Sequence, residues 1–224
     1  MNETTTKTER FKNFVLILTL LNTIFAVILS GLQVDANIRA NNANRDSQYH
    51  ALLASNELVR EGQQGAYDLK LLTNIIRDTQ QSLVMEFTAL ELEQNGDDTN
   101  AADLHIQSQV SQARADKGIS FSRFYSDPRY VPTEEGGAPN LATYVADQYQ
   151  LANELVAKQN AAADDYQKWN GKSDSYVAAL TILAIAFFLL GLAQSTERMR
   201  LFFAVSALTI ILSAILWTGF VILA

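Results

Sequence analysis

Three long apolar runs stand out from an otherwise polar chain, at residues 14–34, 176–193 and 201–224. A helix that crosses the hydrocarbon core of a bilayer needs roughly 20 apolar residues, because that core is about 30 Å thick. Each run is close to this length, and none contains an Asp, Glu, Lys, Arg or His. The pattern predicts an all-α membrane protein with three transmembrane helices, and it argues against ion-coupled transport, which normally needs an ionisable residue inside a span.

The first two runs are separated by a polar insert, residues 35–175, which is about the size of one ordinary domain. A basic segment at 1–13 precedes the first span, and a short turn at 194–200 joins the last two. Within the insert, apolar residues recur every three or four positions along a predicted helix at 47–92, and a weaker heptad-like stripe follows from 141 to 169. The first stripe consists of Leu69, Leu72, Ile76, Leu83, Phe87 and Leu90.

Glycine and proline positions suggest how these helices are divided. We expect a break at Gly62–Gly65, a turn at Asn95–Asp98 and an irregular loop at 118–139, which holds all three prolines. Within that loop, Glu134 and Glu135 are expected to form a solvated turn. These breaks predict a four-helix bundle. Without the break at the glycines, the same pattern predicts a tall two-helix hairpin, and the sequence leaves both arrangements open.

Charge and composition exclude several functions. The insert holds 12 of the 17 Lys and Arg and 21 of the 24 Asp and Glu, so its acidic surface argues against nucleic acid as a partner. The chain has no cysteine, which excludes disulfides and thiolate chemistry. Its two histidines, His50 and His105, lie near no second ligand at a metal-site spacing. We therefore expect no catalytic residue, no metal ligand and no cofactor, and the protein is predicted not to be an enzyme.

Basic residues near the span ends indicate the orientation. Lys7, Arg10 and Lys12 precede the first span, and Arg198 and Arg200 lie in the turn between the last two. We expect a cytoplasmic membrane, and this distribution favours an orientation with the N-terminus inside and the insert at 35–175 outside.

Two groups of residues are candidates for contacts. Asn22 lies near the centre of the first span, where an amide in hydrocarbon needs a partner, so we expect it to form a hydrogen bond between helices. In the proline-containing loop, aromatic rings alternate with arginines, the residue types that anchor protein interfaces. The alternative is that the rings fold back and fill the end of the bundle. The six loop candidates are Phe121, Arg123, Phe124, Tyr125, Arg129 and Tyr130.

The overall layout is a basic first span, an Ala- and Gln-rich insert and a C-terminal pair of spans, the first of which reads Tyr176-Val-Ala-Ala-Leu-Thr-Ile-Leu-Ala. This layout resembles small uncharacterised bacterial membrane proteins of unknown function, a resemblance that implies no activity. We expect a scaffold or accessory subunit of an oligomeric membrane assembly, with membrane lipid, copies of itself or other membrane subunits as partners and no small-molecule substrate. The small residues Ala204, Ser206 and Ala207 are expected to pack against a neighbour. An extracytoplasmic sensor and a pore-forming homo-oligomer are the alternatives.

Overall fold

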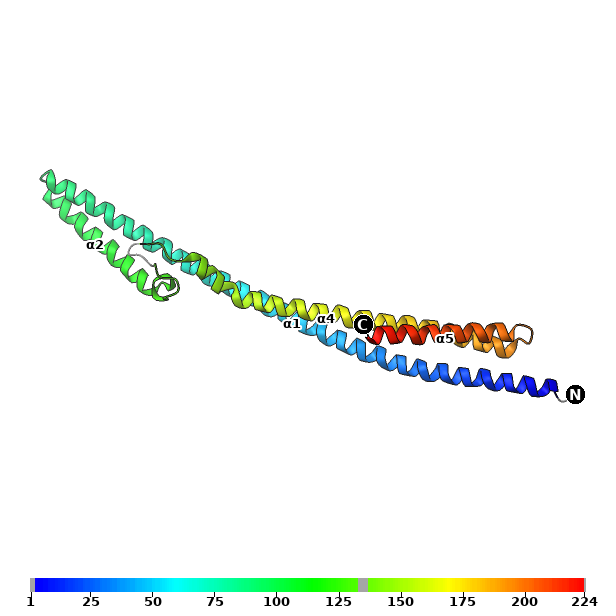
Figure 1. The fold of residues 1–224 in the computed structure, drawn as a ribbon. Coiled ribbons are helices and arrows are strands. Elements are labelled where there is room, and N and C mark those ends of the chain that lie inside the picture. The colour runs from blue at the N-terminus through cyan, green and yellow to red at the C-terminus, as the bar shows by residue number, and fades with distance from the viewer. Residues whose placement is uncertain (1–2, 133–136, 224) are drawn as a thin grey trace. The chain divides into compact units, whose positions relative to one another are not determined.

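The computed structural model describes residues 3–132 and 137–223, with side chains from residue 9 onward. Its helices are α1 (Glu3–Gln94), α2 (Asp98–Phe121), α3 (Arg123–Ser126), α4 (Leu141–Ser195) and α5 (Arg200–Leu223) (Figure 1). These residues contain no strand, which confirms the all-α class, and α1, α4 and α5 are each long and apolar enough to cross a membrane. The turn expected at Glu134 and Glu135 lies outside the described residues.

The predicted helix break at Gly62–Gly65 is wrong, because α1 continues through both glycines. A glycine inside a helix costs only about 1 kcal/mol relative to alanine, so two of them do not end a long helix. Gly65 has a packing role instead. A Cβ atom there would lie 2.8 Å from Nε2 of Gln148, so a larger residue would displace the end of this flexible α4 side chain from its place against α1. The insert therefore does not contain the four separate helices of the predicted bundle.

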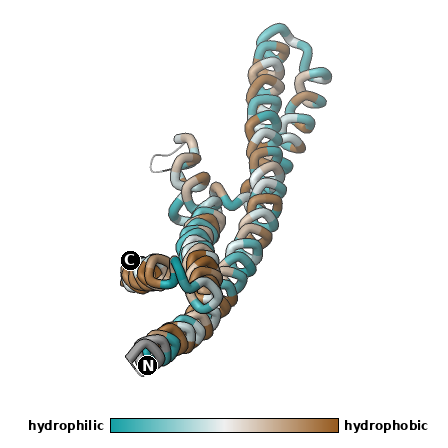
Figure 2. The backbone as a smooth tube through the Cα atoms, turned by 90° about the vertical axis from the view of Figure 1, so that its right-hand side faces the viewer, coloured by the Kyte–Doolittle hydropathy of each residue, from teal (hydrophilic) through white to brown (hydrophobic). Residues whose placement is uncertain are grey.

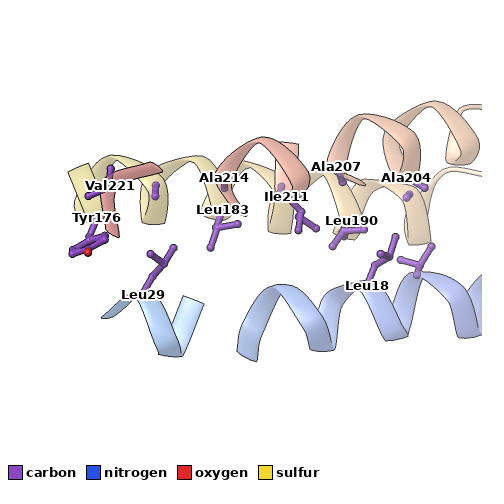
Figure 3. Packing of buried hydrophobic residues seen from close by; sticks show 14 of the residues in the cluster. Leu18, Leu29, Tyr176, Leu183, Leu190, Ala204, Ala207, Ile211, Ala214 and Val221 are labelled. Atoms are coloured by element: carbon purple, nitrogen blue, oxygen red, sulfur yellow. The ribbon is translucent and has the colours of Figure 1, made fainter. Parts of the chain in front are cut away.

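The chain forms two compact units, one made of residues 1–49 and 158–224 and the other of residues 50–157. The first unit contains the three apolar runs. Leu18 and Leu29 of α1 point toward Leu183 and Leu190 of α4, while α5 contributes a face of mostly small side chains (Figure 3). Ala204 and Ala207 belong to this buried face. They pack within the chain and not, as we expected, against a neighbour, because the short turn at 196–199 brings α5 back onto α4 (Figure 1).

A tryptophan lies close to the N-terminal end of the second apolar run. The guanidinium of Arg39 lies 4.7 Å from the centre of the Trp169 ring, and the ammonium of Lys172 lies 5.3 Å from it. Tyr176 is buried seven residues further along α4. Trp and Tyr gather at the boundary between membrane and water in membrane proteins, and this cluster lies where the apolar run of α4 begins.

In the second unit, α1 and α2 form an antiparallel hairpin (Figure 1). Gly96 takes a φ of 82° in the connecting turn, a conformation that favours glycine. The Asp97 carboxylate accepts a hydrogen bond from the backbone N–H of Asn100 and begins α2. Small side chains pack between the two helices of the hairpin. Ser82 and Ser108 are joined by a hydrogen bond of 3.0 Å, and Ala89 and Ala101 are buried.

Candidate protein interface

The aromatic loop begins where α2 ends. Ser122 ends α2, and its hydroxyl accepts a hydrogen bond from the backbone N–H of Phe124, which starts the single turn of α3. This turn points the Phe124 ring inward, where it is completely buried. Its ring centre lies 4.6 Å from that of Tyr144 on α4, and Tyr130 meets Tyr144 edge-on at 5.3 Å. With Leu72 of α1, these three rings form the aromatic core of the second unit.

Charged groups of the loop are paired beside this core. Arg129 binds the carboxylate of Asp127 at 2.8 Å and that of Asp147 on α4 at 2.6 Å. Its hydrogen bonds lower the pKa of Asp127. The Tyr130 hydroxyl donates to Asp147 at 3.1 Å, and burial raises the pKa of Tyr130, as does this hydrogen bond to a carboxylate. The pairs attach the loop to α4.

A buried carboxylate joins α1 to the same core. Asp68 is only 1% exposed, and its two oxygens accept hydrogen bonds from the Tyr144 hydroxyl at 2.6 Å and the Gln64 amide at 3.0 Å. The guanidinium of Arg123 lies 4.0 Å from it. Burial raises the pKa of Tyr144, and the hydrogen bond to Asp68 raises it further. The Tyr144 side chain is therefore held as a neutral phenol, the form that donates this hydrogen bond.

A polar cavity of about 200 Å³ opens beside these groups. It is lined by Glu61, Arg123, Arg129, Tyr130, Tyr144, Asp147, Gln148 and Gln150. The charges around it are of both signs. Within the described residues, no three His, Asp or Glu side chains are placed to hold a metal ion.

The six residues predicted from the sequence to form an interface differ in burial in the structure. Phe124 and Tyr130 lie in the aromatic core, and Tyr125 packs partly buried against it. Phe121 remains 66% exposed, and the side chains of Arg123 and Arg129 are also more than half exposed. The loop therefore fills the end of the unit with some rings and presents one ring and two guanidinium groups to the outside.

An exposed row of apolar side chains lies on α1 in the second unit, and its position differs from what the sequence suggested. Of the stripe expected to form the helix's apolar face, only Leu72 is buried. Its other members are exposed, because α1 packs through Asp68, Ile75, Ser82 and Ala89. Leu52 and Val59 are also exposed and continue this row toward the start of the unit. We call the whole row the α1 seam. The α1 seam consists of Leu52, Val59, Leu69, Ile76, Leu83, Phe87 and Leu90, exposed by 43–69% each.

The α1 seam recurs along the hairpin between hydrophilic positions, and Figure 2 shows this alternation as brown bands between teal ones. Lys70, Arg77 and Glu91 lie beside it, so this stretch is not a membrane span. Large apolar side chains that line up on a soluble surface mark an interaction site, whereas scattered ones need no explanation. The sequence carried most of this signal, since five of the seven residues belonged to the predicted stripe, but it did not show which face would remain uncovered.

In the first unit, the buried Asn22 amide donates a hydrogen bond of 3.2 Å to the backbone carbonyl of Leu183 on α4. This is a contact between two helices, of the kind expected for that residue. Hydroxyls in the first and third apolar runs bind their own helices. Thr19, Thr23, Thr209 and Ser213 each donate to the backbone carbonyl four residues earlier.

His105 lies between two carboxylates of α1. Its Nδ1 is 3.0 Å from Glu86 and its Nε2 is 3.1 Å from Glu93. These hydrogen bonds, that with Glu86 first, raise the pKa of His105. The ring thus bridges α2 to α1.

Comparison with known proteins returned no relative: no family model, no curated protein and no solved structure matches this chain.

Proposed function

We propose that this protein is a non-enzymatic subunit of a membrane assembly, held in the bilayer by its three spans and joined to a partner through the second unit. The observation that carries the proposal is the α1 seam. Burying seven side chains that are now about half exposed would remove a large apolar area from water. Each Å² of apolar surface buried contributes roughly 25 cal/mol of favourable free energy. The α1–α2 contact, which consists largely of Ala and Ser, cannot supply that burial within one chain.

The proposal can be tested without knowing the partner. The chain has no cysteine, so a single introduced thiol is the only one to react. In native membranes, Leu83→Cys should react with an impermeant maleimide at least several-fold more slowly than Gln81→Cys, an exposed position of the same helix outside the α1 seam. The two rates should become equal after denaturation. Equal rates in native membranes would mean that nothing covers the α1 seam, and the proposal would fail.

A sensor is the second candidate, and the polar cavity beside Arg123 and Arg129 favours it. A ligand there would contact guanidinium groups, carboxylates and tyrosine hydroxyls, which suits a small zwitterion. A thermal-shift screen of amino acids and similar zwitterions against the full chain in detergent tests this candidate. A shift that disappears in Arg123→Gln would support it, and no shift across the panel would leave the assembly role alone.

A further inference from the structure

The α1 seam has the repeat of a coiled coil. Its residues occupy the first and fourth positions of successive heptads between Leu52 and Leu90, and the remaining such positions carry short or polar side chains. These are Ser55, Gly62, Ala66, Thr73 and Gln80. All twelve positions are exposed. Gly62, Ala66 and Leu69 line a groove shared with Leu141 and Val145 of α4. A row of exposed heptad positions of this length fits a second long helix with the same repeat.

Resting on the proposed assembly role, we infer that the occupant is a second copy of this chain, whose α1 packs parallel and in register along the same twelve positions. Copies inserted into one bilayer in the same direction begin α1 from the same side, so their helices run the same way. Identical residues then face each other, and the apolar layers at Leu69, Ile76, Leu83 and Leu90 pair with themselves. The apolar positions of one seam therefore meet the apolar positions of the other along the whole contact.

Gln80 fixes the register of this pairing. It is the one long polar side chain among the twelve positions, and it is exposed in the single chain. In register, the two Gln80 amides face each other, and each can donate to and accept from the other. A shift by one heptad would place Gln80 against Thr73 or Phe87. A polar residue at one such position is known to specify register at some cost in stability.

Flanking charges are compatible with the parallel arrangement. Lys70 and Arg77 of one copy come beside Gly65 and Leu72 of the other, so the basic residues meet no like charge. Two symmetry-related like-charge pairs result, in which Glu86 of each copy faces Glu91 of the other. Glu86 is already bound to His105 of its own chain at 3.0 Å, which offsets its charge.

The area is sufficient for a specific contact. Full burial of a side chain of this size contributes about 1.5–3 kcal/mol, which at about 25 cal/mol per Å² corresponds to an area on the order of 100 Å². Seven that are about half exposed, with the five smaller positions between them, offer roughly 500 Å² per copy. Two copies together reach about 1,000 Å², the lower bound for a specific interface.

Disulfide formation in native membranes tests this inference. Under mild oxidation, Gln80→Cys and Leu83→Cys should each give a homodimer at several times the yield of the off-seam control Gln81→Cys. Equal yields at all three positions would overturn it, since they report random collision. Efficient cross-linking only between Gln80→Cys on one copy and Leu83→Cys on another would also overturn it, because that pairing belongs to antiparallel helices.

The two experiments distinguish a failure of self-pairing from a failure of the proposed assembly role. If Leu83→Cys is protected from maleimide in membranes but gives no homodimer with itself, a different partner covers the α1 seam. Self-pairing would then be wrong and the assembly role would stand. If Leu83→Cys is neither protected nor cross-linked, both would be wrong.

Discussion

The hydroxyl of Tyr144 on α4 donates a hydrogen bond of 2.6 Å to the buried carboxylate of Asp68 on α1, 76 residues earlier in the chain. Tyr144 also contacts Phe124 and Tyr130 of the aromatic loop. One side chain therefore connects α1, α4 and the loop. The second unit should depend on it more than on any exposed tyrosine.

Replacing Tyr144 with Phe keeps the ring and removes the donor. The Asp68 carboxylate would lose its shortest hydrogen bond while remaining buried, and bonds to charged groups contribute about 1.5–3 kcal/mol. We expect the free energy of unfolding to fall by about that amount in urea denaturation of the full chain in detergent. Tyr67→Phe is the matched control, because Tyr67 is exposed. Equal stability of the two variants would show that the bond contributes nothing.

Phe121 and Phe124 lie only three positions apart, but the first ring is exposed and the second is buried in the aromatic core. Phe124→Ala should lower the free energy of unfolding by about 3–5 kcal/mol, since it removes a completely buried ring. Phe121→Ala should change it by no more than about 0.5 kcal/mol, because that ring is mostly exposed. The same denaturation measurement compares them. A large loss of stability in Phe121→Ala would contradict the described position of its ring.

His105 should make the α1–α2 hairpin sensitive to pH. Its pKa in the folded chain is raised above the ordinary 6.5 by Glu86 and Glu93, so folding favours the protonated ring. The resulting stabilisation is complete below about pH 6.5 and is lost as the pH rises through the higher folded pKa. The protection of α2 amides from hydrogen exchange, relative to the intrinsic exchange rate at each pH, should fall over that window. In His105→Gln this part of the pH dependence should vanish, and its persistence would assign it to another group.

The charge distribution predicts that the N-terminus and the α4–α5 turn are inside and the insert is outside. In intact cells, Asp103→Cys should react with an impermeant thiol reagent and Ser195→Cys should not, although both positions are exposed in the structure. After the cells are opened, both should react. The reverse pattern in intact cells would invert the orientation.

The sequence was sufficient to predict the helical class and the three apolar spans, because length and hydropathy decide these directly. It failed at Gly62 and Gly65, since propensity treats a glycine as a break, whereas Gly65 accommodates Gln148 of a distant helix. The hydrogen bond of Asn22 could be anticipated from polarity alone, but its acceptor, the carbonyl of Leu183, could not.

The face of α1 that would be covered was also beyond the sequence. A spacing of three and four identifies an apolar stripe, yet the partner helix decides which stripe is buried. Here α2 offers Ala101, Ser108 and Ala115, which fit closely against a narrow face of α1 and leave its leucines outside. The same spacing that predicted a helix thus marks a surface for another molecule.

The central claim, that the protein acts as part of an assembly joined through the α1 seam, is tested most directly by native mass in mild detergent. Wild type and the control Gln81→Glu should have a protein mass greater than that of one 224-residue chain. Leu83→Glu should dissociate to a single chain while remaining helical, because it places a charge in the apolar seam. A wild-type protein that runs as one chain with no co-purifying subunit would contradict the claim.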